Sequence, residues 1–201
     1  MIVFALLLLI TLSFSVEIHL KGAITDICVG ERKIAVATET GSVYILDKEN
    51  FSVKNEIIFP QFTDFMGEKQ NPKVFSVDIS PSGKKLLAVV ETNLGKRDVY
   101  LYSGGKLEKI LKQTDVSEGK FLDENRIILG TIGDEIWLYD IKSKKTIYRY
   151  LVFRFSFSDF ELNEDKTLVA WGDESGKVFF IDPESGRVIG VGTEGNKDKI
   201  F

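Results

Sequence analysis

The 201-residue sequence contains one cysteine, one histidine and four prolines. The single cysteine, Cys28, excludes a disulfide within the chain. The single histidine, His19, alternates with apolar neighbours, which favours a surface or edge-strand position over a place in a catalytic triad or dyad. No cluster of cysteine and histidine residues has the spacing of a zinc site. The sequence therefore predicts no catalytic residue, no metal site and no cofactor.

A strong excess of one charge is also missing. The chain has 26 Lys and Arg residues against 30 Asp and Glu residues, and its isoelectric point is about 5.2. The charges are interspersed and form no basic patch, so a nucleic-acid partner is not expected. Residues 190–195 formally match the pattern Gly-x-Gly-x-x-Gly. No helix pattern follows them, and a nucleotide site of that kind needs one, so we interpret them as a strand end and a loop.

Only one long apolar run occurs, at residues 1–15, "MIVFALLLLITLSFS". Its apolar part is too short to span a bilayer comfortably. Ser13 and Ser15 are small residues at the −3 and −1 positions of a signal peptidase site. We expect a signal peptide over 1–15 and a periplasmic protein that leaves the membrane after cleavage. No Lys or Arg precedes the run, so an uncleaved anchor is the alternative.

Short strands separated by tight turns dominate the remainder. Residues 172–190 read "GDESGKVFFIDPESGRVIG", in which Glu-Ser-Gly-Lys and Glu-Ser-Gly-Arg both have the composition of a turn. The β-branched and aromatic run between them is typical of a strand. With an apolar segment on each side, the stretch predicts three antiparallel strands joined by two hairpins.

This unit recurs four times. Residues 75–86 align without gaps on 157–168, and residues 24–36 and 116–128 form shorter copies. Each copy is followed by a turn and a third strand, and the third strands read "SVYILD", "DVYLYS", "EIWLYD" and "KVFFID". A four-stranded unit that repeats about every 40 residues is the signature of a β-propeller blade.

The sequence thus predicts an all-β protein, a β-propeller of four-stranded antiparallel blades, with about four blades present in an incomplete ring. The propeller domain is expected at 16–201, with a strand at 16–20 ahead of the first blade and the start of a further blade at 199–201. The blades are expected at these residues: 24–59, 74–112, 116–152 and 157–193.

Over about residues 17–201 the repeats resemble the WD-repeat-like and quinoprotein-like propeller families. "VFFIDPESGRVIG" is similar to their Asp-x-x-Ser/Thr-Gly-Lys/Arg-Val turn between the last two strands of a blade. No Gly-His pair precedes a blade, and no third strand ends in Trp-Asp, so the bond network of true WD repeats is not expected. The exported start, "FSVDISPSGKKLL" and "FSDFELNEDKTLVAWGDESGKVFFID" resemble the propeller family encoded with periplasmic nitrate reductases, which is regarded as accessory.

Two insertions are the candidate sites for a partner. "FPQFTDFMGEKQNP" (59–72) links the first two blades, and "TNLGKRD" (92–98) lengthens a hairpin of the second. Blade topology should place both on one face, and clustered aromatic and basic side chains are typical of protein contacts. The alternative is that the Phe residues plug the propeller face. The candidate partner-binding residues are Phe59, Phe62, Phe65, Met66, Lys96 and Arg97.

The expected function is that of a non-catalytic, exported interaction module whose partner is another protein. The resemblance implies a component of a periplasmic nitrate reductase as that partner. The alternative is an enzyme, either a quinoprotein-like dehydrogenase or a propeller hydrolase, with its site in further blades. Trp137 and Trp171 lie on different strands of their blades, so they do not repeat as quinone-docking residues would.

Overall fold

A computed structural model describes residues 16–193. It contains four sheets of four antiparallel strands, and in each sheet the strands lie side by side in chain order. Blade 1 consists of β1 (Ile24–Val29), β2 (Lys33–Thr38), β3 (Ser42–Asp47) and β4 (Val53–Ile58). Blade 2 consists of β7 (Val74–Ile79), β8 (Lys85–Glu91), β9 (Arg97–Ser103) and β10 (Lys106–Thr114).

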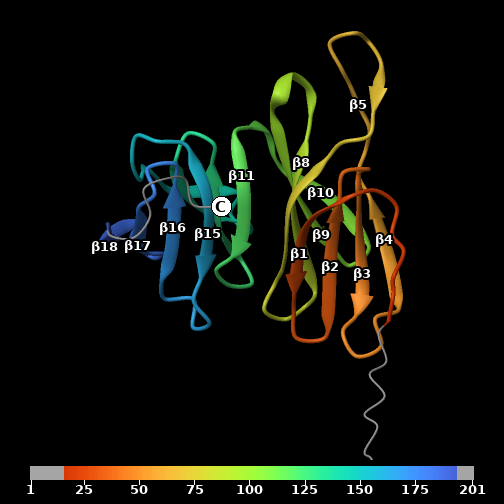
Figure 1. Cartoon of the computed structure of the whole chain (residues 1–201), viewed down its shortest axis with the longest axis horizontal. Helices are drawn as coiled ribbons and strands as arrows, with labels where there is room; N and C mark the ends of the chain where they lie inside the picture. The colour runs from red at the N-terminus through yellow and green to blue at the C-terminus, as the bar shows by residue number, and fades with distance from the viewer. Residues whose placement is uncertain (1–15, 194–201) are drawn as a thin grey trace, which may run out of the picture.

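Blade 3 consists of β11 (Val116–Phe121), β12 (Arg126–Thr131), β13 (Glu135–Asp140) and β14 (Lys145–Leu151). Blade 4 consists of β15 (Phe157–Leu162), β16 (Val169–Asp173), β17 (Val178–Asp182) and β18 (Arg187–Gly192). The expected fold class is confirmed: the protein is all-β, with four-stranded blades (Figure 1).

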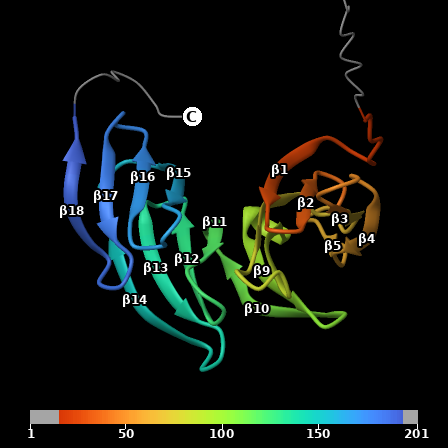
Figure 2. The ribbon, with the colours of Figure 1, turned by 90° about the horizontal axis from the view of Figure 1, so that it is seen from below.

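The four blades form an arc that stays open between blade 1 and blade 4 in the described part of the chain (Figure 2). The first strand of each blade lies next to the first strand of the following blade. The fourth strands, β4, β10, β14 and β18, lie toward the outside of the arc. This is the arrangement of an incomplete propeller.

Three apolar clusters hold the arc together, one between each pair of neighbouring blades. In blades 1 to 3 the middle strands are buried on both faces, which explains why their sequences are continuous apolar runs and do not alternate. In β8, for example, all five residues of 86–90 are buried. Burying such side chains contributes about 1.5–3 kcal/mol each, so the blade-to-blade contacts dominate the stability of the fold.

The first strand of every blade carries a β-bulge between its first and third residues. In β7 the bulge follows Val74, which pairs with Val90; in β15 it follows Phe157, which pairs with Asp173. Val74 and Phe157 are therefore equivalent, and the gapless alignment of 75–86 with 157–168 is wrong by one residue. Both copies carry the bulge, so it does not cause the error. The alignment matched the Phe-Ser pair at 75–76 with the Phe-Ser pair at 157–158, which lies one residue earlier in its strand.

Three of the four turns between third and fourth strands are held by the same hydrogen bond; the turn of blade 2 instead follows Ser103 and uses Gly104 and Gly105, both at positive φ. The carboxylate that ends the third strand accepts a backbone N–H from the turn. Glu49 donates to Asp47, Ser143 donates to Asp140, and Glu184 donates to Asp182. In the last of these turns Gly186 takes a φ of 68°, which glycine adopts without steric cost. The repeated Glu-Ser-Gly-basic motif is confirmed as the chemistry of two tight turns.

One sequence-based expectation does not match the structure, and two others lie outside the described residues. Residues 16–20 form no strand; instead Ile18 and Leu20 pack on Val36, Tyr44 and Leu46 at the outer side of blade 1. A single segment with no partner strand lacks ladder hydrogen bonds, so apolar packing alone sets its place. The expected signal peptide, 1–15, and the expected start of a further blade, 199–201, lie outside the described residues.

The tight blade-to-blade packing generates a prediction at Gly130, at the contact of blades 3 and 4. A Cβ at this position would lie 2.9 Å from Cζ of Phe157 and 3.1 Å from Cη2 of Trp171. Gly130→Ala should therefore cost about 1–3 kcal/mol of folding free energy, as overpacked cores do. Gly133→Ala is the control, because its Cβ would meet no atom within 4 Å. Urea unfolding of both variants measures the difference, and equal stability would contradict the packing argument.

Candidate functional site

One end of the arc carries all the turns between second and third strands and all the links between blades; we call it the loop face. Two segments project from it side by side at the top of Figure 1. One is the short hairpin formed by β5 (Phe62–Thr63) and β6 (Lys69–Gln70). The other is the loop between β8 and β9, which contains the 3₁₀ turn η1 (Asn93–Gly95). Both insertions thus emerge on the same face, as the blade topology predicts.

The insertion at 59–72 is a built hairpin rather than an extended loop. Asp64 organises it: Oδ1 accepts the N–H groups of Met66 and Glu68, both at 2.9 Å, and Oδ2 accepts the side-chain amide of Gln70 at 3.0 Å. These donors hold the pKa of Asp64 below its usual value. A hydrogen-bonded carboxylate of this kind fixes the conformation of the hairpin in the free protein.

The apolar residues of this insertion occupy different environments. Phe65 and Met66 form the tip of the hairpin and are 87% and 72% exposed. Phe62 is half-buried at the base. Phe59 is 2% exposed and packs edge-on against Tyr100 with ring centroids 5.3 Å apart, so its ring belongs to the core between blades 1 and 2.

The two basic residues of the second insertion make contacts within the protein. Lys96 is paired with Asp115 at 2.7 Å and remains partly exposed. Arg97 lies over the ring of Phe75 at 3.8 Å and donates to the carbonyl oxygen of Val116 at 3.2 Å, so it joins blade 2 to blade 3. The exposed apolar group of this loop is Leu94, at 81%. Sequence reasoning missed Leu94, although its position between Asn93 and Gly95 marks a turn.

A pocket of about 380 Å³ opens on the same face between blades 2 and 3. Its walls include Asp115, Ile132, Trp137 and Arg149, and the Arg149 guanidinium lies 4.4 Å from the Trp137 ring centroid. Ile132, in the turn between β12 and β13, is 43% exposed. The loop face therefore combines exposed apolar tips with a mixed polar and aromatic hollow, which is the composition typical of protein contact surfaces.

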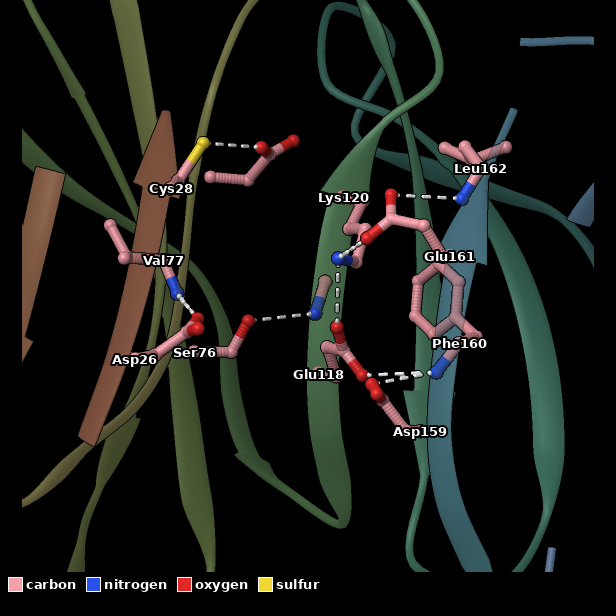
Figure 3. Close-up of polar contacts among 12 residues, drawn as sticks. Asp26, Cys28, Ser76, Val77, Glu118, Lys120, Asp159, Phe160, Glu161 and Leu162 are labelled. Atoms are coloured by element: carbon pink, nitrogen blue, oxygen red, sulfur yellow. Dashed lines mark hydrogen bonds and ion pairs between the residues drawn. The ribbon is translucent and has the colours of Figure 1, made fainter. Parts of the chain in front are cut away.

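The first strands carry a row of polar side chains along the inner side of the arc (Figure 3). Cys28 donates to Asp78 at 3.1 Å, and Lys120 is paired with Glu161 at 2.6 Å. Burial and the nearby Asp78 raise the pKa of the Cys28 thiol to about 12, so it is an unreactive thiol at neutral pH. Cys28 is thus half-buried beside a carboxylate as well as packed against the core.

Next to this row, a pocket of about 230 Å³ is lined by the second and third residues of all four first strands. Glu118 lies in it, and burial, together with a hydrogen bond to Asp159, raises the pKa of Glu118 to about 9. Lys120, 3.2 Å from the Glu118 carboxylate, opposes this rise. Within residues 16–193, no group of three or more His, Cys, Asp or Glu residues is arranged to hold a metal ion.

Two buried carboxylates meet at the contact of blades 3 and 4. Asp134 and Asp173 are both fully buried. Asp134 accepts the indole N–H of Trp171 at 2.7 Å and the backbone N–H of Phe153 at 2.8 Å. Asp173 accepts the N–H of Ser175 through Oδ1, while its Oδ2 has no hydrogen-bond partner. Burial raises the pKa of Asp134 to about 6; repulsion from Asp173 adds to the rise, and the Trp171 hydrogen bond opposes it.

The remaining single-residue expectation concerns His19, whose side chain is 84% exposed and lies 3.4 Å from Glu17. It is at the surface, as predicted, although not in a strand. Residues 190–192 of the glycine pattern end β18, and the part from 194 onward lies outside the described residues. No helix between residues 16 and 193 is long and apolar enough to cross a membrane.

Comparison with known proteins adds no family assignment. No family model matches the chain. No curated protein matches it either. The class is therefore the one that the fold defines: an all-β protein of repeated four-stranded antiparallel sheets, compatible with a propeller.

The buried acid generates a prediction about pH. Because the pKa of Asp134 is raised from 3.8 to about 6 on folding, the folded state binds this proton more tightly than the unfolded state. The stabilisation is fully present below pH 4 and is lost as the pH rises through about 6. Asp134→Asn removes the titration, so its stability should fall less than that of the wild type across this window.

Urea unfolding at pH values from 4 to 8 measures this difference. Asp165→Asn, at an exposed position in the turn between β15 and β16, is the matched control and should follow the wild-type profile. Parallel profiles for Asp134→Asn and the wild type would show that Asp134 does not hold a proton in the folded state.

Proposed function

We propose that this protein is a non-catalytic, exported interaction module that binds a protein partner through its loop face. The observation that carries the proposal is the hairpin tip at Phe65 and Met66, which is both apolar and held in place by Asp64. Leu94, on the neighbouring loop of the same face, adds a second exposed apolar side chain.

The exposed tip of the hairpin gains free energy when a partner covers it. Burying a side chain such as Phe65 or Met66 contributes about 1.5–3 kcal/mol. In the free protein both side chains stay exposed, so this free energy is available to binding. The Asp64 hydrogen bonds reduce the conformational entropy that binding would otherwise cost. A preorganised apolar tip between polar neighbours has the properties of a binding hot spot.

The particular partner we propose is a component of a periplasmic nitrate reductase. The support is the resemblance of "FSVDISPSGKKLL" and "FSDFELNEDKTLVAWGDESGKVFFID" to the accessory propeller family encoded with such enzymes, together with the expected signal peptide at 1–15. Deleting the gene and assaying periplasmic nitrate reductase tests this identity. Lower activity or incomplete maturation is expected, and normal activity under all growth conditions would remove this partner while leaving the loop-face proposal open.

The double substitution Phe65→Ser/Met66→Ser tests the loop face directly. Because both side chains are exposed in the free protein, stability should change by less than about 0.5 kcal/mol. Partner affinity should fall about tenfold or more, as expected when hot-spot side chains are lost. Thermal unfolding and titration against the captured partner measure the two effects. A double variant that binds as well as the wild type would contradict the proposal.

Two further variants distinguish side chains that contact the partner from side chains that support the core or the hairpin. Phe59→Ala should cost about 3–5 kcal/mol of stability because it empties a core position, and any loss of binding should follow unfolding. Asp64→Ala keeps the apolar tip but releases the hydrogen bonds that fix it. It should weaken binding with little change in global stability, and unchanged affinity would show that preorganisation of the hairpin is unimportant.

A further inference from the structure

Neighbouring blades are joined by a hydrogen bond that recurs at each contact. The third residue of each first strand, at the bulge, accepts the backbone N–H of the fourth residue in the next first strand. Asp26 accepts from Val77 at 2.7 Å, Ser76 from Gly119 at 3.4 Å, and Glu118 from Phe160 at 3.3 Å. Figure 3 shows these three bonds side by side along β1, β7, β11 and β15.

On the open side of blade 4, no described residue of a following blade donates a backbone N–H to the acceptor side chain. Asp159 is the equivalent of Asp26, Ser76 and Glu118, and it bonds only to its own blade and to Glu118. Beside it, Phe180 is 36% exposed and Val178 is half-buried. These two residues correspond through their strand pairings to Leu138 and Ile136 of blade 3.

Leu138 and Ile136 show how these positions are buried when another blade packs on the face. Both are at most 1% exposed and are buried in the cluster that joins blade 3 to blade 4. The open face of blade 4 thus repeats, position by position, a surface that elsewhere in this chain receives the first strand of another blade.

The strand that would donate the backbone N–H is β1, and it is exposed at the opposite end of the arc, on blade 1. The residues that face the preceding blade are the first, fourth and sixth of each first strand. In β15 these are Phe157, Phe160 and Leu162, all at most 8% exposed. In β1 the equivalent residues are 53–59% exposed; they are Ile24, Ile27 and Val29.

The backbone of β1 also has the geometry needed to donate a hydrogen bond to a neighbouring blade. The N–H of Ile27 donates to its own Asp26 Oδ1 at 2.8 Å. The N–H of Phe160 makes the same bond to Asp159 at 2.9 Å and, in addition, approaches Glu118 of the preceding blade. Ile27 therefore has the geometry of Phe160 without the second acceptor. Ile18 and Leu20 cover the outer part of this face, which leaves β1 as its accessible part.

We propose that the open face of blade 4 binds the exposed β1 edge of blade 1 in a second copy of this chain, in a head-to-tail contact. Asp159 accepts the N–H of Ile27 from the second copy, and Phe180 and Val178 cover the exposed apolar residues of β1. Such a contact is heterologous, so it closes into a ring or continues into a chain according to the angle between copies.

Sedimentation equilibrium over a wide range of concentrations tests the contact. The wild type should associate as its concentration rises. Phe180→Asp, which disables the blade 4 face, and Ile27→Asp, which disables the β1 edge, should each weaken self-association about tenfold or more. Phe65→Asp, at an equally exposed apolar position on the loop face, is the matched control and should associate as the wild type does.

An equal mixture of the two variants gives the sharpest result. Phe180→Asp retains an intact β1 edge, and Ile27→Asp retains an intact blade 4 face. A head-to-tail contact therefore predicts that the mixture forms 1:1 pairs that grow no further, whereas a symmetric contact between identical faces predicts no such recovery. Val29→Asp and Asp159→Lys repeat the experiment if circular dichroism shows that either first variant fails to fold.

Three results would overturn the proposal. The first is a wild type that stays monomeric at every concentration. The second is association that survives both substitutions or is lost equally in the Phe65→Asp control. The third is a mixture that fails to pair. Loss of association in the Phe65→Asp control would move the contact to the loop face. The other results do not bear on the loop face, because Phe65 and Met66 lie outside the proposed contact.

Discussion

The bulge in the first strand of each blade is the local feature on which the arc depends. It turns the third residue toward the next blade, where an oxygen of Asp26, Ser76 or Glu118 accepts a backbone N–H. A strand at the inner side of a blade has one edge without a ladder partner, and an unpaired N–H that is shielded from water is costly. The side-chain oxygen satisfies that group and at the same time sets the spacing of neighbouring blades. The apolar clusters between blades then form around a fixed inner seam.

This division of roles explains where the molecule keeps surface for other purposes. The inner seam and the three clusters use mainly the first, second and third strands of each blade, joined by Ile57 of β4 and Tyr148 of β14. The tips of the two insertions on the loop face lie outside these contacts and can change without disturbing them, whereas Phe59, at the base of the first insertion, belongs to the cluster between blades 1 and 2. Asp64 gives the hairpin at 62–70 an internal structure of its own, so Phe65 and Met66 stay exposed in a defined position. Arg97, in contrast, is drawn from its insertion into the contact of blades 2 and 3.

Much of the fold could be predicted because each blade repeats the same local chemistry. Apolar runs bounded by turn residues marked the strands, and the aspartates Asp47, Asp140 and Asp182 marked the turns that follow the third strands. The candidate site was less predictable. Phe59, Phe62, Phe65 and Met66 looked alike as apolar residues in an irregular stretch. Their burial depends on whether each side chain turns toward Tyr100 or toward solvent, and no pattern in the stretch encodes that choice.

The sequence by itself determined the class of fold, the number of four-stranded units and the face on which the insertions emerge, because these follow from local periodicity and from turns that act over a few residues. The tertiary structure alone decided which polar residues act across blades. Asp26 and Val77, Lys120 and Glu161, and Trp171 and Asp134 are far apart in the chain and meet only after the blades pack. It also decided the fate of residues 16–20, whose alternating pattern predicts a strand but which find apolar packing on blade 1 and no partner strand. The physical reason is that strand pairing and burial are long-range interactions, and one chain segment does not specify its partner.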